Sequence, residues 1–274
     1  MEFTAQLAEK VKELIAIDGK TIRNSSKNPL HIVSAWCEAN EMVLAQVKVA
    51  NKSNEIIAIP KLLELLDLTG KIITIDAMGC QRDIAEQIVE DGGDYVLGLK
   101  GNQKTLREDA EDYFQNLVEF TGEIWQEYNK GHGRQEERIT YVTEAIKALQ
   151  KHHNWPGLNS LALVISTRTI KGKTTKEKRY YISSLPANAE KICRAARKHW
   201  GVENKLHWRL DVDFNEDKAC IRNENAAENM NIMRKWALNI LSPQKGKNSI
   251  RSLQRKAAMS WGHMTKLLEQ IFHA

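Results

Sequence analysis

Two short apolar runs, each closed by an aspartate, constrain the fold more than any other feature of this sequence. Leu14–Ile17 leads directly into Asp18, and Ile72–Ile75 leads directly into Asp76. Both runs predict strands, and the second is nearly all apolar, as expected of a strand that is buried on both faces of a sheet. If the two strands are neighbours, the two carboxylates lie at the same edge of the sheet.

Two carboxylates in one place favour a site for divalent metal ions. Close like charges destabilise each other unless a cation lies between them. Mg²⁺ prefers hard oxygen ligands and is commonly held by one or two carboxylates together with substrate phosphates. A turn would explain either aspartate alone, since Asp18-Gly19 is a common turn pair. The occurrence of both aspartates in this topology favours metal ligands.

Helical periodicity and turn residues place these runs in an alternating order of strands and helices. The predicted elements are the end of a helix at 5–13, strands at 14–18, 31–37 and 42–49, a helix from 53 or 54 to about 68, a strand at 71–76, a helix at about 82–89 and a strand at 94–99. The first three strands can form an antiparallel meander, whereas helical crossovers require the next strands to run parallel. A mixed sheet with helices on its faces is therefore expected.

Beyond residue 102 the pattern predicts a helix at 103–120, strands at 123–128, 138–143, 161–169 and 179–182, and then helices from 187 to near the end, with a break at 242–248. We therefore expect a first part of the core at 1–120, a β-rich insertion at 121–186, and a helical part at 187–274 that completes the core and ends in basic helices.

The composition excludes several classes of protein. With 42% hydrophobic and 27% charged residues the chain is globular, and no apolar run approaches the roughly 20 residues of a membrane helix. The first residues give no sign of a secretory signal. The four cysteines, Cys37, Cys80, Cys193 and Cys220, are isolated from one another. This spacing predicts a cytoplasmic protein with buried thiols and no structural metal.

The positive charge is concentrated near the C-terminus. Residues 191–274 hold 16 Lys and Arg against 8 Asp and Glu, whereas the remaining residues hold 24 against 27. A basic end attached to a nearly neutral body is typical of a protein that binds a polyanion such as DNA. A solvated pair of basic helices without a partner explains the charge alone equally well.

A third carboxylate must come from the helical C-terminal part. The acids available there are Glu203, Asp211, Asp213, Glu216 and Asp217. Helical spacing places Glu203 on one face with Trp200, Asn204 and His207. That mixture of acidic, polar and aromatic groups is unusual for core packing, although an amphipathic helix with half-buried tryptophans would also produce it.

Several ordered motifs resemble the H-repeat-associated, ISAs-type insertion-sequence transposases. The motifs lie at 17–21, 75–81, 99–103, 132–134, 155–158, 199–208 and 210–212, and so extend over nearly the whole chain. The resemblance implies an α/β fold: an RNase H-like mixed sheet core with a β-rich insertion and a helical C-terminal part. It also implies a catalytic and metal-binding triad of Asp18, Asp76 and Glu203, with Mg²⁺ as the cofactor and Mn²⁺ as a substitute.

The chain departs from the wider superfamily in two ways. That superfamily places Tyr, Arg and Lys at fixed offsets around the catalytic Glu, and here these offsets hold Ala196, His199 and Leu210. Arg197 and Arg209 are the candidates to replace them. In addition, only seventeen residues precede Asp18, whereas family members usually carry a longer segment there. An N-terminally shortened copy could lack part of its DNA-recognition machinery and be inactive.

The expected partner is double-stranded DNA at the ends of an insertion sequence and in its target, held by a homodimer in a paired-end complex at the nucleoid. Basic and polar residues near the motifs are expected to contact the DNA backbone, and Trp155 to stack on an unpaired base, although packing beside Pro156 explains Trp155 better. The expected DNA-binding residues are Lys20, Arg23, Lys100, Asn102, Gln103, His132, Arg134, Trp155, Arg197, His199, Asn204, His207, Arg209, Arg251 and Arg255. An ordinary helix N-cap explains Asn102 at least equally well.

Three alternative functions remain open at this point. The chain could be a truncated or domesticated transposase that binds DNA without cutting it. It could also be an RNase H-like nuclease that cuts but does not join ends. A glycosidase with two carboxylates is a distant third, because it gives no reason for the basic C-terminus.

Overall fold

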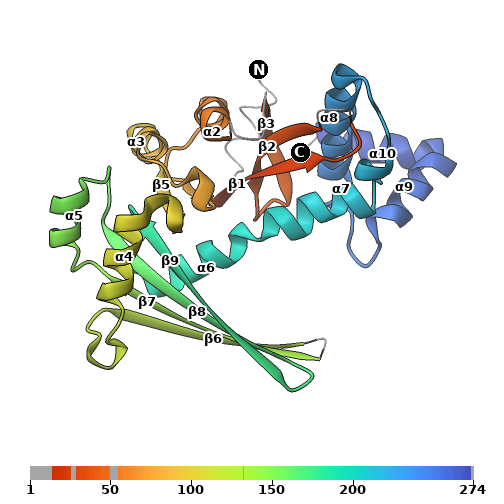
Figure 1. Ribbon diagram of the computed structural model, residues 1–274. Coiled ribbons are helices and arrows are strands. Elements are labelled where there is room, and N and C mark those ends of the chain that lie inside the picture. The colour runs from red at the N-terminus through yellow and green to blue at the C-terminus, as the bar shows by residue number, and fades with distance from the viewer. Residues whose placement is uncertain (1–13, 26–28, 50–54, 132, 273–274) are drawn as a thin grey trace. The chain divides into compact units, whose positions relative to one another are not determined.

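A computed structural model describes residues 14–25, 29–49, 55–131 and 133–272 (Figure 1). The described residues form two compact units. The first unit consists of 16–66 and 200–272, and the second consists of 14–15 and 67–199. The helix predicted at 5–13, the predicted helix start at 53 or 54, and His132 lie outside the described residues.

The first unit is built on three consecutive strands in the order β3-β2-β1. They are β1 (Leu14–Ile22), β2 (Leu30–Cys37) and β3 (Met42–Val49). Strands β2 and β3 are antiparallel, with a register shift between Ala35 and Trp36. Helices α2 (Glu55–Leu63) and α8 (Glu224–Leu241) both contact these two strands. Every residue of β2 is buried, so helices cover this strand on both faces.

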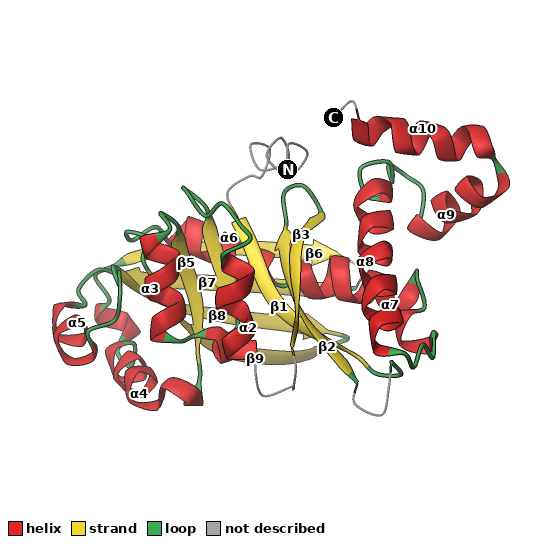
Figure 2. Cartoon of the chain, turned by 90° about the horizontal axis from the view of Figure 1, so that it is seen from above, coloured by secondary structure: helices red, strands yellow, loops and turns green. Residues whose placement is uncertain are grey.

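Helices complete the first unit. A π-helical segment η5 (Val202–His207) continues into α7 (Trp208–Val212), and the short turn η6 (Glu216–Lys218) leads to α8. Helices α9 (Ile250–Met259) and α10 (Trp261–Phe272) follow and contact α8 (Figure 2). The core of this unit joins apolar residues from the strands and the helices, among them Trp36, Val202, Leu206 and Leu238.

The second unit holds a mixed sheet. Strands β4 (Ile72–Ile75) and β5 (Asp94–Leu99) are parallel and joined by helix α3 (Arg82–Glu90). Beyond β5 the order continues as β9-β8-β7-β6, and all of these pairings are antiparallel. These strands are β6 (Glu123–Gly131), β7 (Arg134–Thr143), β8 (Ser160–Ile170) and β9 (Lys173–Ser183). In Figure 1 they form the long green and cyan strands.

Helices α4 (Lys104–Tyr113), α5 (Lys147–His153) and α6 (Ala189–His199) also belong to the second unit, with the short turns η2 (Ala77–Gly79), η3 (Gly101–Gln103) and η4 (Leu117–Glu119). The first residues of β1 pack in this unit, because Leu14 joins a buried cluster with Ile72 and Val96.

The structure corrects several predicted boundaries. Strand β1 does not end at residue 18 but continues to Ile22, and the helix predicted at 103–120 ends at Tyr113. Helix α5 was not predicted, and irregular segments between 213 and 223 interrupt the expected C-terminal helices. Strand β9 begins at Lys173, earlier than predicted. The prediction missed this start because the first six residues are all exposed and show no apolar alternation. The predicted domain boundaries at 120 and 186 remain a prediction.

Three of the four cysteines are buried, and the prediction was wrong for Cys220, which is exposed. Within the described part of the chain, no helix has the length and apolarity needed to cross a membrane.

Helix α8 carries a lysine into the core of the first unit. Lys235 is 3% exposed, and its Nζ donates to Ser34 Oγ at 2.8 Å and to Gln46 Oε1 at 2.7 Å. Burial lowers the pKa of Lys235 to about 7; the charge of Glu216 opposes this shift and that of Lys20 adds to it. The folded state therefore favours the neutral amine.

This lysine should make stability depend on pH. Between pH about 7 and 10.5 the unfolded chain binds a proton that folded Lys235 does not, so the free energy of unfolding should rise with pH, by at most about 1.4 kcal/mol per unit. Lys235→Met should remove this rise. Urea denaturation of both proteins across this pH range measures the difference, and parallel curves would contradict the assignment.

Candidate active site

Asp18 lies within β1, at the point where the strand emerges from the core. The four residues before it are buried, and the next three after it are half-buried. The predicted end of the strand at Asp18 was wrong, because the strand continues to Ile22. The Asp18 side chain is 29% exposed, and its Oδ2 lies 3.5 Å from Nδ1 of His207. A partly exposed carboxylate at this point of the strand is well placed to bind a cation.

The residue after Asp18 is a glycine that lies close to two other side chains. A Cβ at Gly19 would collide with the carboxylate of Glu55 and would lie 2.8 Å from His31 Nε2. His31 is buried, hydrogen-bonded through Nδ1 with Thr21 Oγ1 at 2.8 Å and paired through Nε2 with Glu55. Gly19 thus leaves room for the His31–Glu55 pair to pass close to β1.

Asp76 follows β4 directly, as the sequence predicts. Its Oδ1 accepts a hydrogen bond from the backbone N–H of Met78 at 3.0 Å and caps the turn η2. This bond fixes the direction of the carboxylate at the end of the strand. Asp76 is half-buried, whereas the neighbouring Ile75 and Ala77 are buried.

Two amide side chains hold the turn that follows Asp76. Asn102 Nδ2 donates to the carbonyl of Ala77 at 2.6 Å, and Gln103 Nε2 donates to the carbonyl of Cys80 at 3.0 Å. Helix α4 begins only at Lys104, and its N-cap makes no side-chain hydrogen bond. Asn102 is therefore not the cap of α4 that the sequence suggested; Gln103 holds the N-cap position but does not cap the helix through its side chain. Because their donors are used on backbone carbonyls, both residues position the Asp76 turn.

His199 closes α6 in the second unit. One of its ring atoms, Nδ1, lies 3.1 Å from Thr74 Oγ1. Burial lowers the pKa of His199, although the negative charge of Asp76 and a hydrogen bond with Thr74 oppose this shift. A neutral imidazole therefore lies within electrostatic range of Asp76. The contact of Thr74 with His199 was not predicted, because in the sequence Thr74 is only a polar residue inside an apolar strand.

Glu203 is exposed on the π-helical segment η5, whose opposite side is locked into the core. Val202, Leu206 and Leu210 are buried in the same cluster as Trp36. Asn204 is also exposed, with its Nδ2 donating to the Trp200 carbonyl at 2.8 Å. π-Helical segments are rare in proteins. Those that do occur are often found at functional sites.

The predicted shared face of this helix is only partly present. Trp200, Glu203 and Asn204 are exposed, but His207 is 8% exposed and its ring faces Asp18. His207 therefore belongs to the packing around Asp18 and does not present a DNA-binding surface, which corrects that prediction.

A half-buried glutamate holds the start of this helix. Glu38 accepts hydrogen bonds from Trp36 Nε1 at 2.9 Å and from Lys205 Nζ at 2.6 Å. A Cβ on Gly201 would lie 2.7 Å from Glu38 Cδ, so only glycine allows this close approach. The role of Glu38 was not predicted, because Lys205 and Gly201 lie more than 160 residues along the chain.

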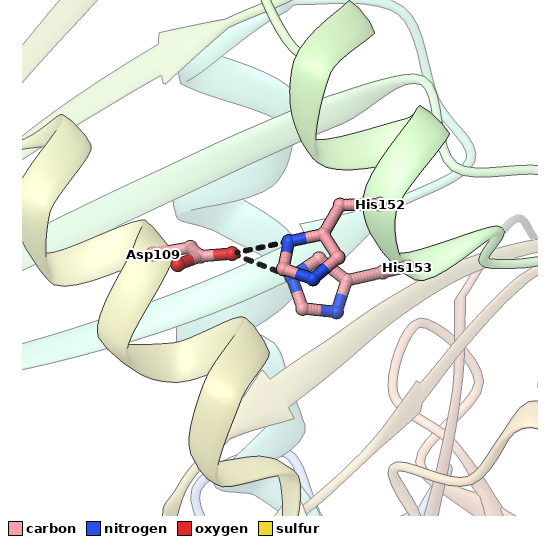
Figure 3. A group of neighbouring side chains, drawn as sticks. All are labelled: Asp109, His152 and His153. Atoms are coloured by element: carbon pink, nitrogen blue, oxygen red, sulfur yellow. Dashed lines mark hydrogen bonds and ion pairs between the residues drawn. The ribbon is translucent and has the colours of Figure 1, made fainter.

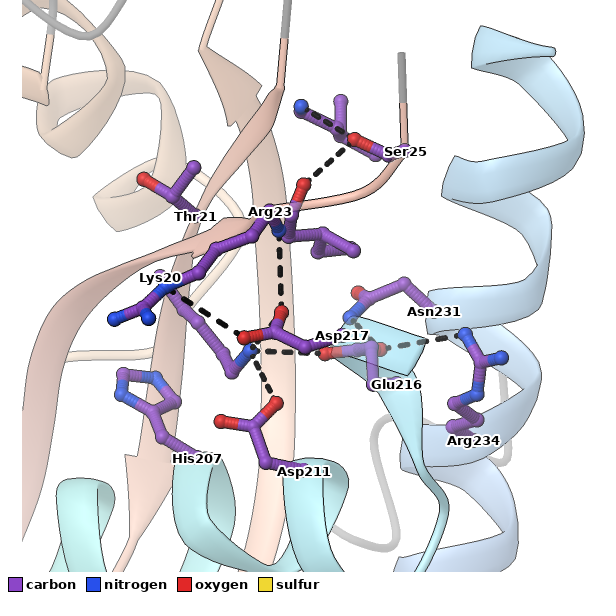
Figure 4. A network of polar contacts seen from close by, with 12 residues as sticks. Lys20, Thr21, Arg23, Ser25, His207, Asp211, Glu216, Asp217, Asn231 and Arg234 are labelled. Carbon is purple, nitrogen blue, oxygen red and sulfur yellow. Dashed lines mark hydrogen bonds and ion pairs between the residues drawn. The ribbon is translucent and has the colours of Figure 1, made fainter. Parts of the chain in front are cut away.

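The other acids considered as third carboxylate are engaged in ion pairs. Lys20 Nζ lies 2.8 Å from Asp211, 3.4 Å from Glu216 and 3.4 Å from Asp217 (Figure 4). Asp213 pairs with Arg209 at 2.9 Å. Glu203 is the candidate whose carboxylate is exposed, which favours it for binding a ligand from solution.

Lys20 was predicted to contact DNA, and this prediction was wrong. Its side chain is 10% exposed and lies among three carboxylates. Burial alone would lower the pKa of Lys20, but the hydrogen bond to Asp211 and the charges of the carboxylates raise it above its ordinary value. Lys20 therefore stays charged as part of the interior of the first unit.

Trp155 is 1% exposed, so its ring offers no surface on which a base can stack. It packs beneath Arg82, whose guanidinium carbon lies 5.8 Å from the ring centre. Burial of Trp155 favours the packing interpretation over the predicted contact with a base.

The remaining predicted DNA contacts differ in their surroundings. Arg23, Lys100, Arg134 and Arg255 are exposed. Arg197 pairs with Glu127 at 3.1 Å. Arg209 lies over the Trp208 ring, with its guanidinium carbon 5.3 Å from the centre. Arg251 is exposed and donates to the Val212 carbonyl at 2.7 Å.

Comparisons with known proteins relate the whole chain to one family. Residues 9–240 match the family described as "Transposase DDE domain". The chain is 45% identical over 271 residues to "H repeat-associated putative transposase YhhI" of Escherichia coli (strain K12), covering 94% of this chain and 71% of that protein. Its similarity to YbfL of the same strain has the same identity and coverage.

The chain also resembles a solved structure, the piggyBac transposase synaptic complex with hairpin DNA. The TM-score is 0.54 at 12% identity, covering 97% of this chain and 56% of the piggyBac chain. At this identity the likeness shows a shared fold. The predicted α/β fold class, with an RNase H-like mixed sheet, is confirmed.

The lowered pKa of His199 predicts a second dependence of stability on pH. Below about pH 6.5 the unfolded chain protonates this histidine while the folded chain resists protonation, so the free energy of unfolding should fall as the solution is acidified. His199→Gln should lose less stability than the unmodified protein on going from neutral to mildly acidic pH. Chemical denaturation at several pH values tests this, and an equal loss in both proteins would refute it.

Proposed function

Since this chain belongs to the transposase DDE-domain family, we propose that it cleaves DNA strands at the ends of an insertion sequence and joins them to target DNA. The proposed catalytic residues are Asp18, Asp76 and Glu203, acting with Mg²⁺ or Mn²⁺. The expected partner is double-stranded DNA, bound by two copies of the chain in a paired-end complex.

The observation that carries this proposal is that Glu203 is exposed on a helix whose other side packs in the core. Its helix is fixed to the core by Val202 and Leu206, while the carboxylate itself is exposed. The same helix presents His207 to Asp18 at 3.5 Å. Rigid support for an exposed acid suits a ligand-binding role, because catalytic groups must be held in position before the substrate arrives.

Asp76 has a comparable support in the second unit. Its backbone cap and the two amides of Asn102 and Gln103 hold the turn that carries it. The neighbouring His199, kept neutral by burial, adds no positive charge that would compete with a cation. These contacts keep the Asp76 carboxylate available in one orientation.

The donor set fits a hard divalent cation. All three proposed ligands are carboxylates, and oxygen ligands are those that Mg²⁺ prefers. When bound, Mg²⁺ supplies positive charge that lowers the pKa of an attacking water and stabilises the departing 3′ oxygen of the cleaved strand. The carboxylates contribute position and negative charge, and the same groups serve the later attack of a DNA 3′-hydroxyl on target DNA.

Removing any proposed ligand charge should abolish chemistry while sparing the fold. Asp18→Asn, Asp76→Asn and Glu203→Gln should each lower Mg²⁺-dependent cleavage by about a hundredfold or more. The assay uses DNA carrying both ends of the element, with cut and joined products separated on gels. Circular dichroism and DNA binding should stay unchanged.

Glu269→Gln provides the matched control, since Glu269 is an exposed glutamate on α10 in the same unit as Glu203. It should cleave as the unmodified chain does. Robust cleavage by any triad variant would overturn the assignment. Cleavage without joined product would favour the alternative of a nuclease that cuts DNA but does not join ends. Failure of the unmodified chain to cleave with either Mg²⁺ or Mn²⁺ would favour the alternative of a protein that binds DNA without cutting it.

Exposed cations of α9 are proposed to follow the DNA backbone. Arg251 and Arg255 lie one turn apart and are both exposed. Each phosphate contact releases condensed counterions, so affinity should fall steeply with salt. The double variant Arg251→Ala/Arg255→Ala should reduce the slope of log K against log salt by about 2.

Fluorescence anisotropy with labelled DNA at several salt concentrations measures this slope. Arg107→Ala is the control, because Arg107 pairs with Glu111 on α4, and its slope should equal that of the unmodified chain. A flat salt response, or an unchanged slope in the double variant, would contradict the proposed surface.

A further inference from the structure

A group of side chains of the types that ligate metals lies in the second unit, apart from the proposed triad. Asp109 comes from α4, and His152 and His153 close α5 (Figure 3). Asp109 Oδ2 lies 2.6 Å from His153 Nε2 and 3.5 Å from His152 Nδ1. One ligand atom of each residue lies within 4.8 Å of the other two.

The end of α5 directs both histidines toward one carboxylate. Adjacent residues in a regular helix point about 100° apart, yet here the two imidazole rings lie side by side, with centroids 4.6 Å apart and planes tilted by 31°. The helix stops at Asn154, which has a left-handed backbone with φ of 45°. The His153 carbonyl also accepts a hydrogen bond from Arg82. The last turn is therefore held in place by contacts outside the helix.

Burial differs among the three side chains in a way that suits uptake of an ion. The His153 side chain is 10% exposed, whereas those of Asp109 and His152 are 38% and 71% exposed. One ligand is thus fixed inside the protein, and the other two face solvent and leave a path for entry.

We propose that Asp109, His152 and His153 bind one divalent transition-metal ion, with Zn²⁺ as the first candidate. Two imidazole nitrogens and one carboxylate oxygen form a mixed donor set that suits Zn²⁺, whereas Mg²⁺ prefers oxygen ligands alone. The site would differ in metal type from the proposed carboxylate triad.

The observed distances are close to those of a bound ion. Ligands at about 2.1 Å from Zn²⁺ in a tetrahedron lie about 3.4 Å from each other, and His152 Nδ1 is already 3.5 Å from Asp109 Oδ2. The His153–Asp109 contact must lengthen from 2.6 Å by less than about 1 Å. Both ligating imidazole nitrogens must be unprotonated, so metal binding would release any proton they hold. Three protein ligands leave a fourth position for water.

A bound ion would join α4 to α5 and so strengthen the surroundings of Asp76. Helix α4 follows directly after Asn102 and Gln103, whose amides hold the turn after Asp76. Arg82, which binds the His153 carbonyl, begins α3 a few residues beyond that turn. The metal site itself does not depend on the proposed transposase activity.

The experiment titrates the full chain, freed of any affinity tag, with Zn²⁺ by calorimetry in excess Mg²⁺, and with Co²⁺ by visible absorption. We expect equimolar Zn²⁺ binding in the micromolar range or tighter, a Co²⁺ spectrum typical of low coordination number, and a higher melting temperature with Zn²⁺. His152→Asn and Asp109→Asn should weaken binding by about tenfold or more.

Two controls separate this site from other histidines and from the triad. His152 is mostly exposed, so His152→Asn should fold normally, and the adjacent Lys151→Asn should bind Zn²⁺ as the unmodified chain does. Asp18→Asn, which disables the proposed catalytic site, should keep full Zn²⁺ affinity. Unchanged Zn²⁺ affinity in His152→Asn, or loss of binding in Asp18→Asn, would overturn the proposal.

Discussion

The first unit depends on one ion network around the largely buried side chains of Lys20 and Glu216. Lys20 from β1 meets Asp211 from α7 and Glu216 and Asp217 from η6, so segments about 190 residues apart are joined by charge. Glu216 is fully buried and also accepts a hydrogen bond from Asn231 Nδ2 at 2.9 Å (Figure 4). Buried charges are costly unless each is satisfied by partners. The network therefore favours one register between β1 and the helices and disfavours all others.

That register has a direct effect on the proposed chemistry. Asp18 lies two residues before Lys20, and Glu203 lies on the helical segment that continues into Asp211. Fixing Lys20 against Asp211 thus fixes Asp18 against the helix of Glu203, as the 3.5 Å approach of His207 to Asp18 shows. In the second unit, one hydrogen bond from the backbone and two amide side chains hold the turn that carries Asp76.

Local signals in the sequence predicted much of the fold. The observed bounds of β3 and β5 are those predicted, because both segments are apolar or alternate clearly. The polar first half of β9 and the short helix α5 were not predicted, since neither segment has a strong apolar periodicity. Lys20 was misassigned for a different reason: nothing near it in sequence reveals three acids that lie about 190 residues away. Glu203 was favoured over its neighbours chiefly by family resemblance, and the ion pairs of Asp211, Asp213 and Asp217 now supply a physical reason.

The close approach of Gly201 to Glu38 has a consequence for how this sequence can vary. Any other residue at 201 would displace the Glu38 carboxylate from Trp36 and Lys205, and with it the start of the helix that carries Glu203. A substitution at 201 would therefore act on Glu203 from a distance, through the Glu38 carboxylate and without touching the exposed acid itself.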